Sequence, residues 1–151
     1  MFETTSLAGW GDMDFNSHMR NTAYLDKSGD ARMQFFAAHD FPVPEFARLR
    51  IGPVVMKDEV EYFREIHLLE QIKVTLALVA MAEDGSRFQL RNEFFRADGQ
   101  LAARVTSTGG WLDLGRRKLI APPEGLLAAM RIMGQGSEVK ILPSSLSAKA
   151  P

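Results

Sequence analysis

Two Asp-Gly dipeptides in the second half of the chain constrain its fold more than any other feature of the sequence. They lie inside short polar turns at residues 83–86 and 97–100, and Asp-Gly is the strongest short signal for a β-hairpin. A looser polar turn precedes them at residues 65–70. The turns separate four strand-like segments, at residues 51–66, 72–83, 88–96 and 101–112, the last of which continues to 114. The sequence therefore predicts an antiparallel meander.

Hydrophobic periodicity distinguishes the two faces of this sheet. In the first segment, the apolar and aromatic side chains at positions 60, 62 and 66 alternate with glutamates at positions 59, 61 and 65. Such alternation indicates one buried face and one wetter face. Residues 74–81 are more continuously apolar. We therefore expect that strand to lie inside the sheet.

The first half of the chain predicts a helix. Apolar residues between positions 18 and 39 fall on a broad helical stripe, and Asn16 and Ser17 before it are both good N-caps. Gly29 inside this helix costs about 1 kcal/mol of helix propensity and would let a sheet approach closely. Pro42 and Pro44 then end the helix. We expect one long central helix, preceded by a short strand within residues 2–10.

These elements predict the α+β fold class. One long helix with a strand before it and four antiparallel strands after it packs most simply when the sheet wraps around the helix. That sheet has an exposed edge and a limited core, and pairing of two subunits commonly cures both defects, so we expect a homodimer. Residues 124–133 predict a short helix. The domain would span residues 1–134, and residues 135–151 would form a mobile tail with at most a brief strand at 139–142.

Composition excludes several classes of function. The 151 residues, 46% of them hydrophobic, suit a single domain that buries roughly 70% of its unfolded surface. A formal net charge of −1 supplies no positive field, so no nucleic-acid partner is expected. With no cysteine, the chain can form no disulfide, thiolate zinc site, iron–sulfur cluster or cysteine nucleophile. Its three histidines are too widely separated for a recognisable metal site.

Membrane association is not expected either. The longest apolar stretch, at residues 74–82, is interrupted by a threonine and is too short to span a bilayer. The polar start of the chain does not resemble a signal peptide. We therefore expect a soluble, cytoplasmic protein.

The polar loop before the predicted helix is the strongest candidate for chemistry. It holds two carboxylates, Asp12 and Asp14, together with the amide of Asn16 and the imidazole of His18. A helix start offers unpaired backbone N–H groups and the positive end of the helix dipole, which suit a carbonyl oxygen that becomes negative. A carboxylate beside them could attack the carbonyl or activate water. The same residues would also make sense as helix caps and turn formers without any chemistry.

Several stretches together resemble one enzyme family. They are Trp10-Gly-Asp-Met-Asp14, Ser17-His-Met-Arg-Asn21, Tyr24-Leu25 and Ala31-Arg32, and in the second half Val60-Glu-Tyr62, Gly110-Trp111, Asp113, Arg117-Lys118 and Ile120 to Pro122. The combination resembles the hot-dog thioesterases of the 4-hydroxybenzoyl-CoA thioesterase type and covers roughly residues 6–130. The resemblance implies a hot-dog fold, in which an antiparallel five-stranded sheet wraps around one long central helix.

The resemblance also implies roles for residues. Asp14, rather than Asp12, matches the catalytic aspartate of the family, and the backbone N–H of Asn21 lies where the family polarises the thioester carbonyl. His18 could equally be a structural histidine, and Tyr24 could simply pack on the helix. The implied substrate-binding set comprises Asn16, Ser17, His18, Arg20 and Tyr24.

Two of these positions depart from the family pattern. Ser17 replaces a glycine, which could narrow the approach of the substrate to the helix start. Arg20 replaces the first of two asparagines and brings a cation near the acid. Its guanidinium would either reach Asp14 and favour the ionised carboxylate, or point outward and contact a CoA phosphate.

The expected activity is hydrolysis of an acyl-CoA thioester, with Asp14 as nucleophile or as general base on water. CoA arrives as part of the substrate, so no metal or redox cofactor is expected. Basic side chains would hold its phosphates, and the candidates are Arg87, Arg91 and residues 116–118. The assembly would be a homodimer or a dimer of dimers.

Two alternatives remain open at this point. An enoyl-CoA hydratase-like enzyme would pair Asp14 with His18, although the spacing is one residue short of the hydratase dyad. A non-catalytic acyl-CoA-binding protein would have kept the fold while Ser17 and Arg20 spoiled the site.

Overall fold

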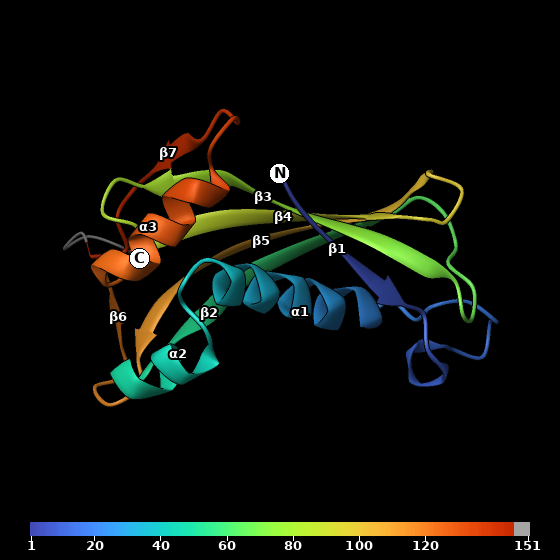
Figure 1. Ribbon diagram of the computed structural model, residues 1–151, viewed down its shortest axis with the longest axis horizontal. Coiled ribbons are helices and arrows are strands. Elements are labelled where there is room, and N and C mark those ends of the chain that lie inside the picture. Colours follow the sequence, from blue (N-terminus) through green and yellow to red (C-terminus); the bar gives the residue numbers. More distant parts are fainter. Residues whose placement is uncertain (147–151) are drawn as a thin grey trace.

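The computed structural model describes residues 1–146, which form one seven-stranded sheet and three α-helices (Figure 1). The strands are β1 (Phe2–Leu7), β2 (Ile51–Tyr62), β3 (Gln71–Ala82), β4 (Arg87–Phe95), β5 (Leu101–Asp113), β6 (Lys118–Ile120) and β7 (Lys140–Leu142). The helices are α1 (Ala23–Ala38), α2 (Val43–Leu49) and α3 (Glu124–Met133), with a short 3-10 helix at Trp10–Asp12. None of the helices in the described residues is long and apolar enough to cross a membrane.

The sheet wraps around α1, as the sequence predicts, but its strand order differs from a simple meander. The order is β1-β3-β4-β5-β2, with β6 paired to β5 and β7 paired parallel to β3. The two Asp-Gly turns make the β3-β4-β5 hairpins, and β3 lies inside the sheet as expected. The looser turn after β2 does not make a hairpin, because residues 63–70 carry the chain from one edge of the sheet to the far side of β4.

The expected five-stranded sheet with one long helix is not confirmed in detail, since the described residues hold seven strands, and two shorter helices, α2 and α3, accompany α1. The helix predicted at residues 124–133 is confirmed as α3, and β7 lies within the predicted brief strand. The missed helix α2 begins at Pro42, its N-cap, and has Pro44 in its first turn, where proline is tolerated. The two prolines that end one helix therefore also begin the next. The last five residues of the expected tail, 147–151, lie outside the described residues.

The long helix starts five residues later than predicted. Asn16 and Ser17 do not cap it; Thr22 is the N-cap and makes no side-chain capping hydrogen bond. Before it, the chain folds back on itself through a bridge between Met13 and Met19, whose amide also donates to the carbonyl of Ile66 at 2.7 Å. Met19 is buried through this fold-back, so an apolar position that fits a helical stripe is in fact part of a loop.

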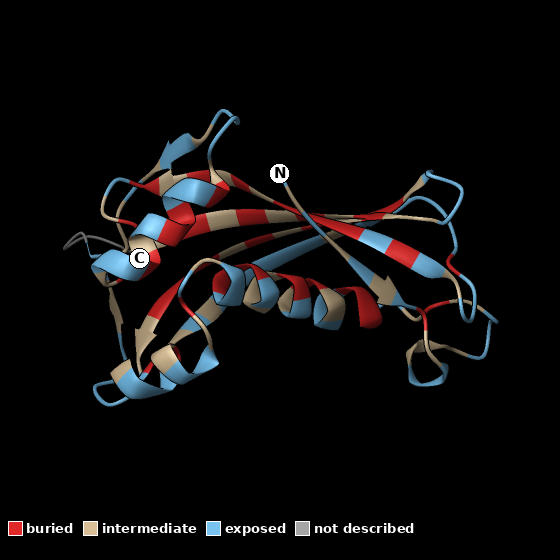
Figure 2. Ribbon diagram, in the orientation of Figure 1, coloured by how far each residue is buried: buried red, intermediate tan, exposed pale blue. Residues whose placement is uncertain are grey.

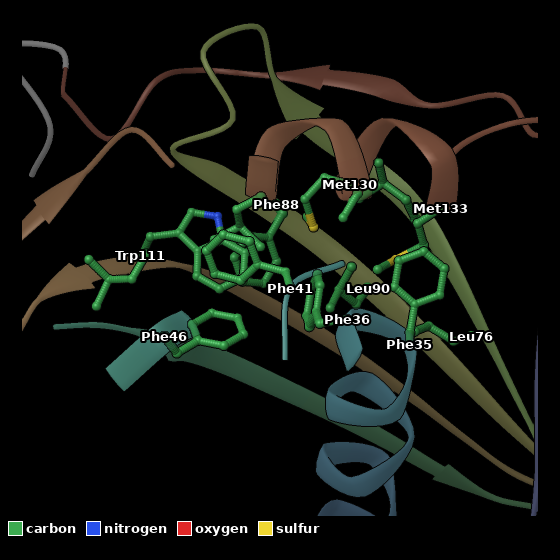
Figure 3. Close-up of a cluster of buried hydrophobic side chains, with 14 residues drawn as sticks. Phe35, Phe36, Phe41, Phe46, Leu76, Phe88, Leu90, Trp111, Met130 and Met133 are labelled. Carbon is green, nitrogen blue, oxygen red and sulfur yellow. The ribbon is translucent and has the colours of Figure 1, made fainter. Parts of the chain in front are cut away.

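Burial follows the faces of the sheet (Figure 2). Buried and partly exposed residues alternate along β4, and the buried side of α1 faces the sheet. One core cluster is rich in aromatic rings, with Phe36 and Trp111 in edge-to-face contact at a centroid distance of 5.7 Å, and Met130 of α3 covers it (Figure 3). Each such buried ring stabilises the fold by about 1.5–3 kcal/mol. A second cluster, which includes Tyr24 and Phe94, lies beneath the loop before α1.

A polar tie fixes α1 on the sheet. Arg32 of α1 donates from Nε to Asn92 Oδ1 at 3.0 Å and from a terminal nitrogen to Ser107 Oγ at 2.8 Å. Ser107 in turn donates to the carboxylate of Asp58 on β2. Burial lowers the pKa of Arg32 to about 10, and the charge of Asp58 opposes this shift. The tie links the helix to three strands and therefore fixes its rotation over the sheet.

Two glycines, Gly29 and Gly109, differ in how closely other atoms approach them. The sequence predicts a close approach of the sheet at Gly29, and this is wrong, because a Cβ added there would meet no atom within 4 Å. At Gly109 on β5, a Cβ would collide with the carbonyl oxygen of Val54 on β2. The β2–β5 register shifts beside this point, between Val55 and Lys57. Gly109 is therefore required by the close approach of two strands.

We predict that Gly29→Ala raises the free energy of unfolding by about 0.5–1 kcal/mol, because alanine favours the helix and meets no neighbour. Gly109→Ala should lower it by about 2 kcal/mol, because the new methyl group forces β2 away. Urea denaturation followed by circular dichroism measures both changes. Destabilisation by Gly29→Ala, or no effect of Gly109→Ala, would contradict this packing.

Candidate active site

Asp12 anchors the loop that precedes α1. Its Oδ2 accepts a hydrogen bond from the amide of Gly9 at 2.8 Å and lies 3.0 Å from Lys27 Nζ on α1. Partial burial alone would raise the pKa of Asp12, but the hydrogen bond from Gly9 and the ammonium of Lys27 outweigh it and hold the pKa below its usual value. Lys27 also donates to Ser6 Oγ and to the carbonyl of Leu7 at the end of β1. The contacts of the Asp12 carboxylate thus stabilise the loop before α1.

Asp14 occupies a different environment, inside the fold-back. Its Oδ1 accepts hydrogen bonds from the amides of Asn16 at 2.9 Å and His18 at 3.5 Å, and its Oδ2 lies 3.4 Å from His18 Nδ1. His18 Nδ1 also lies 3.1 Å from the carbonyl of Met19. Both neighbours are acceptors, so Nδ1 carries a proton and His18 helps to orient the Asp14 carboxylate.

The Asp14 carboxylate lines a cavity of about 530 Å³. Five of the residues predicted from the sequence meet there, from the loop and the first turns of α1: Asp14, Asn16, His18, Asn21 and Tyr24. The other wall comes from Met19 and from the end of β2 and the turn after it: Tyr62, Phe63, Arg64 and Glu65. The sequence offered only the family-like Tyr62 as a signal for this second wall. We call this space the polar cavity.

The amide N–H of Asn21 is available at the start of α1. Within residues 1–146 it makes no hydrogen bond, whereas the carbonyl of Asn21 accepts one from the Tyr62 hydroxyl at 3.0 Å. Asn21 lies two residues before the first residue of the helix, at the positive end of the helix dipole. This N–H can therefore stabilise negative charge on a carbonyl oxygen in the polar cavity.

Tyr24 presents a second donor to the same space. Its ring is 3% exposed and makes edge-to-face contacts with Tyr62 and Phe94, at centroid distances of 5.4 and 5.3 Å. Burial, together with the nearby Tyr62 and the carboxylates of Glu70 and Asp14, raises the pKa of Tyr24 to about 12. The hydroxyl therefore stays protonated at neutral pH. It makes no hydrogen bond to any described residue.

Arg20 does not turn toward the acid. Its guanidinium donates to the carbonyl of Gly11 and to Thr22 Oγ1, the latter at 3.0 Å, and lies 3.9 Å from Asp26. It lines neither the polar cavity nor the second hollow that lies on the other side of Asp14. In this arrangement Arg20 braces the loop against the start of α1.

Ser17 lies on the other side of Asp14, at a second hollow of about 520 Å³. Its φ of 68° is in the left-handed region, which glycine adopts without steric cost. This backbone conformation is the physical reason why a glycine suits the position. The hollow is lined by Trp10, Met13, Asp14, Phe15, Ser17 and Leu68, and we call it the Trp10 groove.

The basic residues proposed for CoA phosphates do not line the polar cavity of this chain. Arg87 and Arg91 alternate on β4 with buried residues that face α1, so they lie on the opposite face of the sheet. Residues 116–118 lie in the β5–β6 turn and at the first residue of β6, at the far end of the molecule from the loop (Figure 1). The cation at the cavity is Arg64, which sequence reasoning missed. In the described part of the chain, no cluster of three or more His, Asp or Glu side chains could hold a metal ion.

Most of the chain, including this site, matches one known superfamily. Residues 8–130 match the thioesterase-like superfamily. The chain belongs to this superfamily. The match is to the superfamily as a whole, so the narrower likeness to the 4-hydroxybenzoyl-CoA thioesterase type stays a prediction. No curated protein matches the sequence.

Solved structures share the hot-dog-like fold of this superfamily. One is a hypothetical protein of Staphylococcus aureus in complex with CoA, with a TM-score of 0.82 and 21% identity over 99% of this chain and 94% of that chain. Another is a 1,4-dihydroxy-2-naphthoyl-CoA thioesterase from Synechocystis, with a TM-score of 0.77 and 17% identity over 86% and 95% of the two chains. A third is a probable thioesterase from Escherichia coli, with a TM-score of 0.73 and 21% identity over 88% and 98%.

We predict that Ser17→Gly raises the free energy of unfolding by about 1 kcal/mol, because glycine relieves the left-handed backbone strain. Asn16→Gly is the matched control, since the neighbouring Asn16 has no positive φ and should gain nothing. Thermal denaturation of both variants measures the difference. Equal effects of the two changes would show that the strain at Ser17 is not significant.

Proposed function

We propose that this protein hydrolyses acyl-CoA thioesters. The observation that carries the proposal is that Asp14 and Asn21 line one cavity at the start of α1, and that the N–H of Asn21 makes no hydrogen bond within residues 1–146. A carboxylate opposite an oxyanion donor is the arrangement that thioester hydrolysis needs. Membership of the thioesterase-like superfamily and the fold shared with a CoA-bound protein support the same activity.

The chemistry follows one of two routes. As a general base, Asp14 takes a proton from water, which attacks the thioester carbon; the tetrahedral intermediate then expels the CoA thiolate, which takes up that proton. As a nucleophile, Asp14 attacks the carbon itself and the C–S bond breaks, which expels the CoA thiolate and leaves a mixed anhydride. Water then hydrolyses the anhydride, which releases the free acid, restores the Asp14 carboxylate and supplies the proton that the thiolate takes up. In both routes the carbonyl oxygen becomes negative beside the N–H of Asn21. The hydroxyl of Tyr24 is the second donor to this oxygen.

The remaining residues of the polar cavity bind and orient. His18 holds the Asp14 carboxylate through its Nδ1 proton, at 3.4 Å from Oδ2. The backbone N–H of Asn16 donates a hydrogen bond to the same carboxylate, and Asn16 also lines the cavity. Arg64 is the cation at the cavity wall and would attract the phosphate-bearing part of the substrate. No metal or redox cofactor enters this scheme.

The contact between Asp14 and His18 favours one second candidate, an enoyl-CoA hydratase-like activity. In that reaction the pair would add water across a carbon–carbon double bond instead of cleaving the thioester. Assaying thiol release and enoyl-CoA hydration on the same preparation separates the two activities. Binding of acyl-CoA with neither reaction would instead support the non-catalytic alternative.

We also propose that two copies of the chain form the functional unit, either as a homodimer or as a dimer of dimers. Strand β2 is an edge of the sheet. It leaves Val55 and Met56 exposed in its middle and Tyr62 at its end, and Phe63 is exposed directly after it. Pairing along β2 would cover these side chains and satisfy the free backbone groups of the edge. The end of β2 is also one wall of the polar cavity, so a second copy would narrow the opening of the site.

We predict that Asp14→Asn lowers kcat for thiol release about a hundredfold or more, because the isosteric amide can act neither as base nor as nucleophile. Asp12→Asn is the matched control: it should weaken the anchor to Lys27 and reduce stability, with a much smaller effect on kcat. A thiol-reactive chromogenic reagent measures turnover, and circular dichroism verifies the fold. Near-normal turnover by Asp14→Asn, or a larger loss in Asp12→Asn, would overturn the assignment.

For the assembly, sedimentation velocity at micromolar concentration should give at least the mass of a dimer, because the exposed edge needs a partner. The enzyme assay is run at the same concentration. A strict monomer that still turns over substrate would contradict a site shared between subunits.

A further inference from the structure

The Trp10 groove meets the polar cavity at a single residue. Asp14 lines both spaces, and each has room for part of a substrate, at about 530 and 520 Å³. A thioester carbonyl held at Asp14 therefore has one substituent directed to each side. The two hollows differ in chemistry, and this difference determines which substituent lies in which hollow.

The walls of the Trp10 groove are apolar. Trp10 is 85% exposed and Phe15 is 98% exposed, although both are large side chains that normally gain by burial. Leu68 and Met13 complete the apolar lining, and Asp14 is the one charged group among the six lining residues. An apolar patch of this kind, next to a reactive carboxylate, marks a binding surface. The polar cavity is also lined by Met19, Tyr62 and Phe63, and it differs from the groove in holding the charged side chains of Arg64 and Glu65 together with His18.

The backbone next to the groove is strained at two points. Ser17 and Leu69 both have a φ of 68°, and for leucine this conformation is a genuine outlier. Leu69 is itself exposed, beside the lining residue Leu68. Leu69 is held in this conformation by the hydrogen bond from its amide to the carbonyl of Ala8 at 2.7 Å, and strained residues of this kind often cluster at ligand-binding segments.

We propose that the Trp10 groove binds the acyl group of the substrate and selects uncharged, apolar acyl groups. The inference rests on the proposed thioesterase function and names the substrate class of that site. The polar, phosphate-bearing CoA lies on the side of the polar cavity, where Arg64 stands. A carboxylate on the acyl group is rejected, because the groove holds no cation and the acyl group would carry its charge toward Asp14.

The first experiment compares acyl-CoA substrates of different length and charge. Octanoyl-CoA has more methylene groups than acetyl-CoA, and an open groove removes only part of each from water. We therefore expect kcat/KM to be roughly thirtyfold higher for octanoyl-CoA than for acetyl-CoA. Succinyl-CoA should be hydrolysed at least about tenfold more slowly than butanoyl-CoA, which has the same chain length without the charge. Equal rates along the series would overturn the inference.

Two variants of the groove test whether its side chains cause the preference for longer acyl groups. Trp10→Ala should lower the ratio of octanoyl to acetyl kcat/KM by about tenfold, because it removes one wall of the groove. Phe15→Ala should act in the same direction and provides a second, independent variant. Ile141→Ala is the matched control, since Ile141 is 72% exposed and apolar but lies on β7, away from the groove. Its ratio should equal that of the unaltered protein. An unchanged ratio in both groove variants would contradict the assignment.

Binding can be measured without turnover. The chain has two tryptophans, of which Trp111 is fully buried, so changes in emission on adding ligand report on Trp10. A hydrolysis-resistant octyl-CoA thioether should shift the emission to shorter wavelength, whereas free CoA should not. If the thioether shifts the Trp10 emission but no acyl-CoA substrate releases thiol, the proposed hydrolase activity is wrong and the groove still binds the acyl group. If acyl-CoA substrates release thiol but there is neither an emission shift nor a chain-length preference, the groove does not bind the acyl group and the hydrolase proposal still stands.

A second copy of this chain is the competing occupant of the groove. In that case Trp10→Ala would weaken the dimer in sedimentation and leave the ratio of octanoyl to acetyl kcat/KM unchanged. That result would overturn the inference.

Discussion

The loop between β1 and α1 is held by the carboxylate of Asp12, and the geometry of the site depends on this contact. Asp12 accepts hydrogen bonds from Gly9 and Lys27, and Lys27 also binds the end of β1. The Lys27 side chain is largely buried, so the pair is less screened than a surface salt bridge. One lysine thus joins the strand, the 3-10 helix and α1 into a single unit. The fold-back that carries Asp14 starts from this unit.

Positive φ angles occur in turns at both ends of the molecule, at Asp40, Arg50 and Arg117 as well as at Ser17 and Leu69. The aromatic core around Trp111 packs against α2 and α3, which lie at the opposite end of the molecule from the loop before α1 (Figure 1). Ser17 and Leu69, with positive φ, lie instead near Asp14 and the Trp10 groove. The two acids of this loop differ because Asp12 contacts Gly9 and Lys27, whereas Asp14 contacts Asn16 and His18.

Much of the sheet could be predicted, because Asp-Gly turns and strand alternation are local signals. The start of α1 could not be predicted, because the burial of Met19 has the same sequence pattern whether it lies in a helix or in a fold-back. The pairing of β2 with β5 could not be predicted, because it joins residues distant in sequence and no hairpin turn links the two strands. Half of the polar cavity was predictable, since its residues are contiguous in a family-like motif. Arg64 was not, because a charged residue in a turn carries no signal of its own.

The proposed hydrolysis requires a thioester carbonyl to lie between the carboxylate of Asp14 and the amide of Asn21. A crystal structure of the protein with a hydrolysis-resistant acyl-CoA, in which a ketone replaces the thioester, would show where this carbonyl binds. We expect the ketone oxygen to lie within hydrogen-bond distance of the Asn21 N–H and its carbon to face Asp14. The acyl chain should enter the Trp10 groove. A ketone bound elsewhere on the molecule, or beside Asp12 instead of Asp14, would contradict the proposed mechanism.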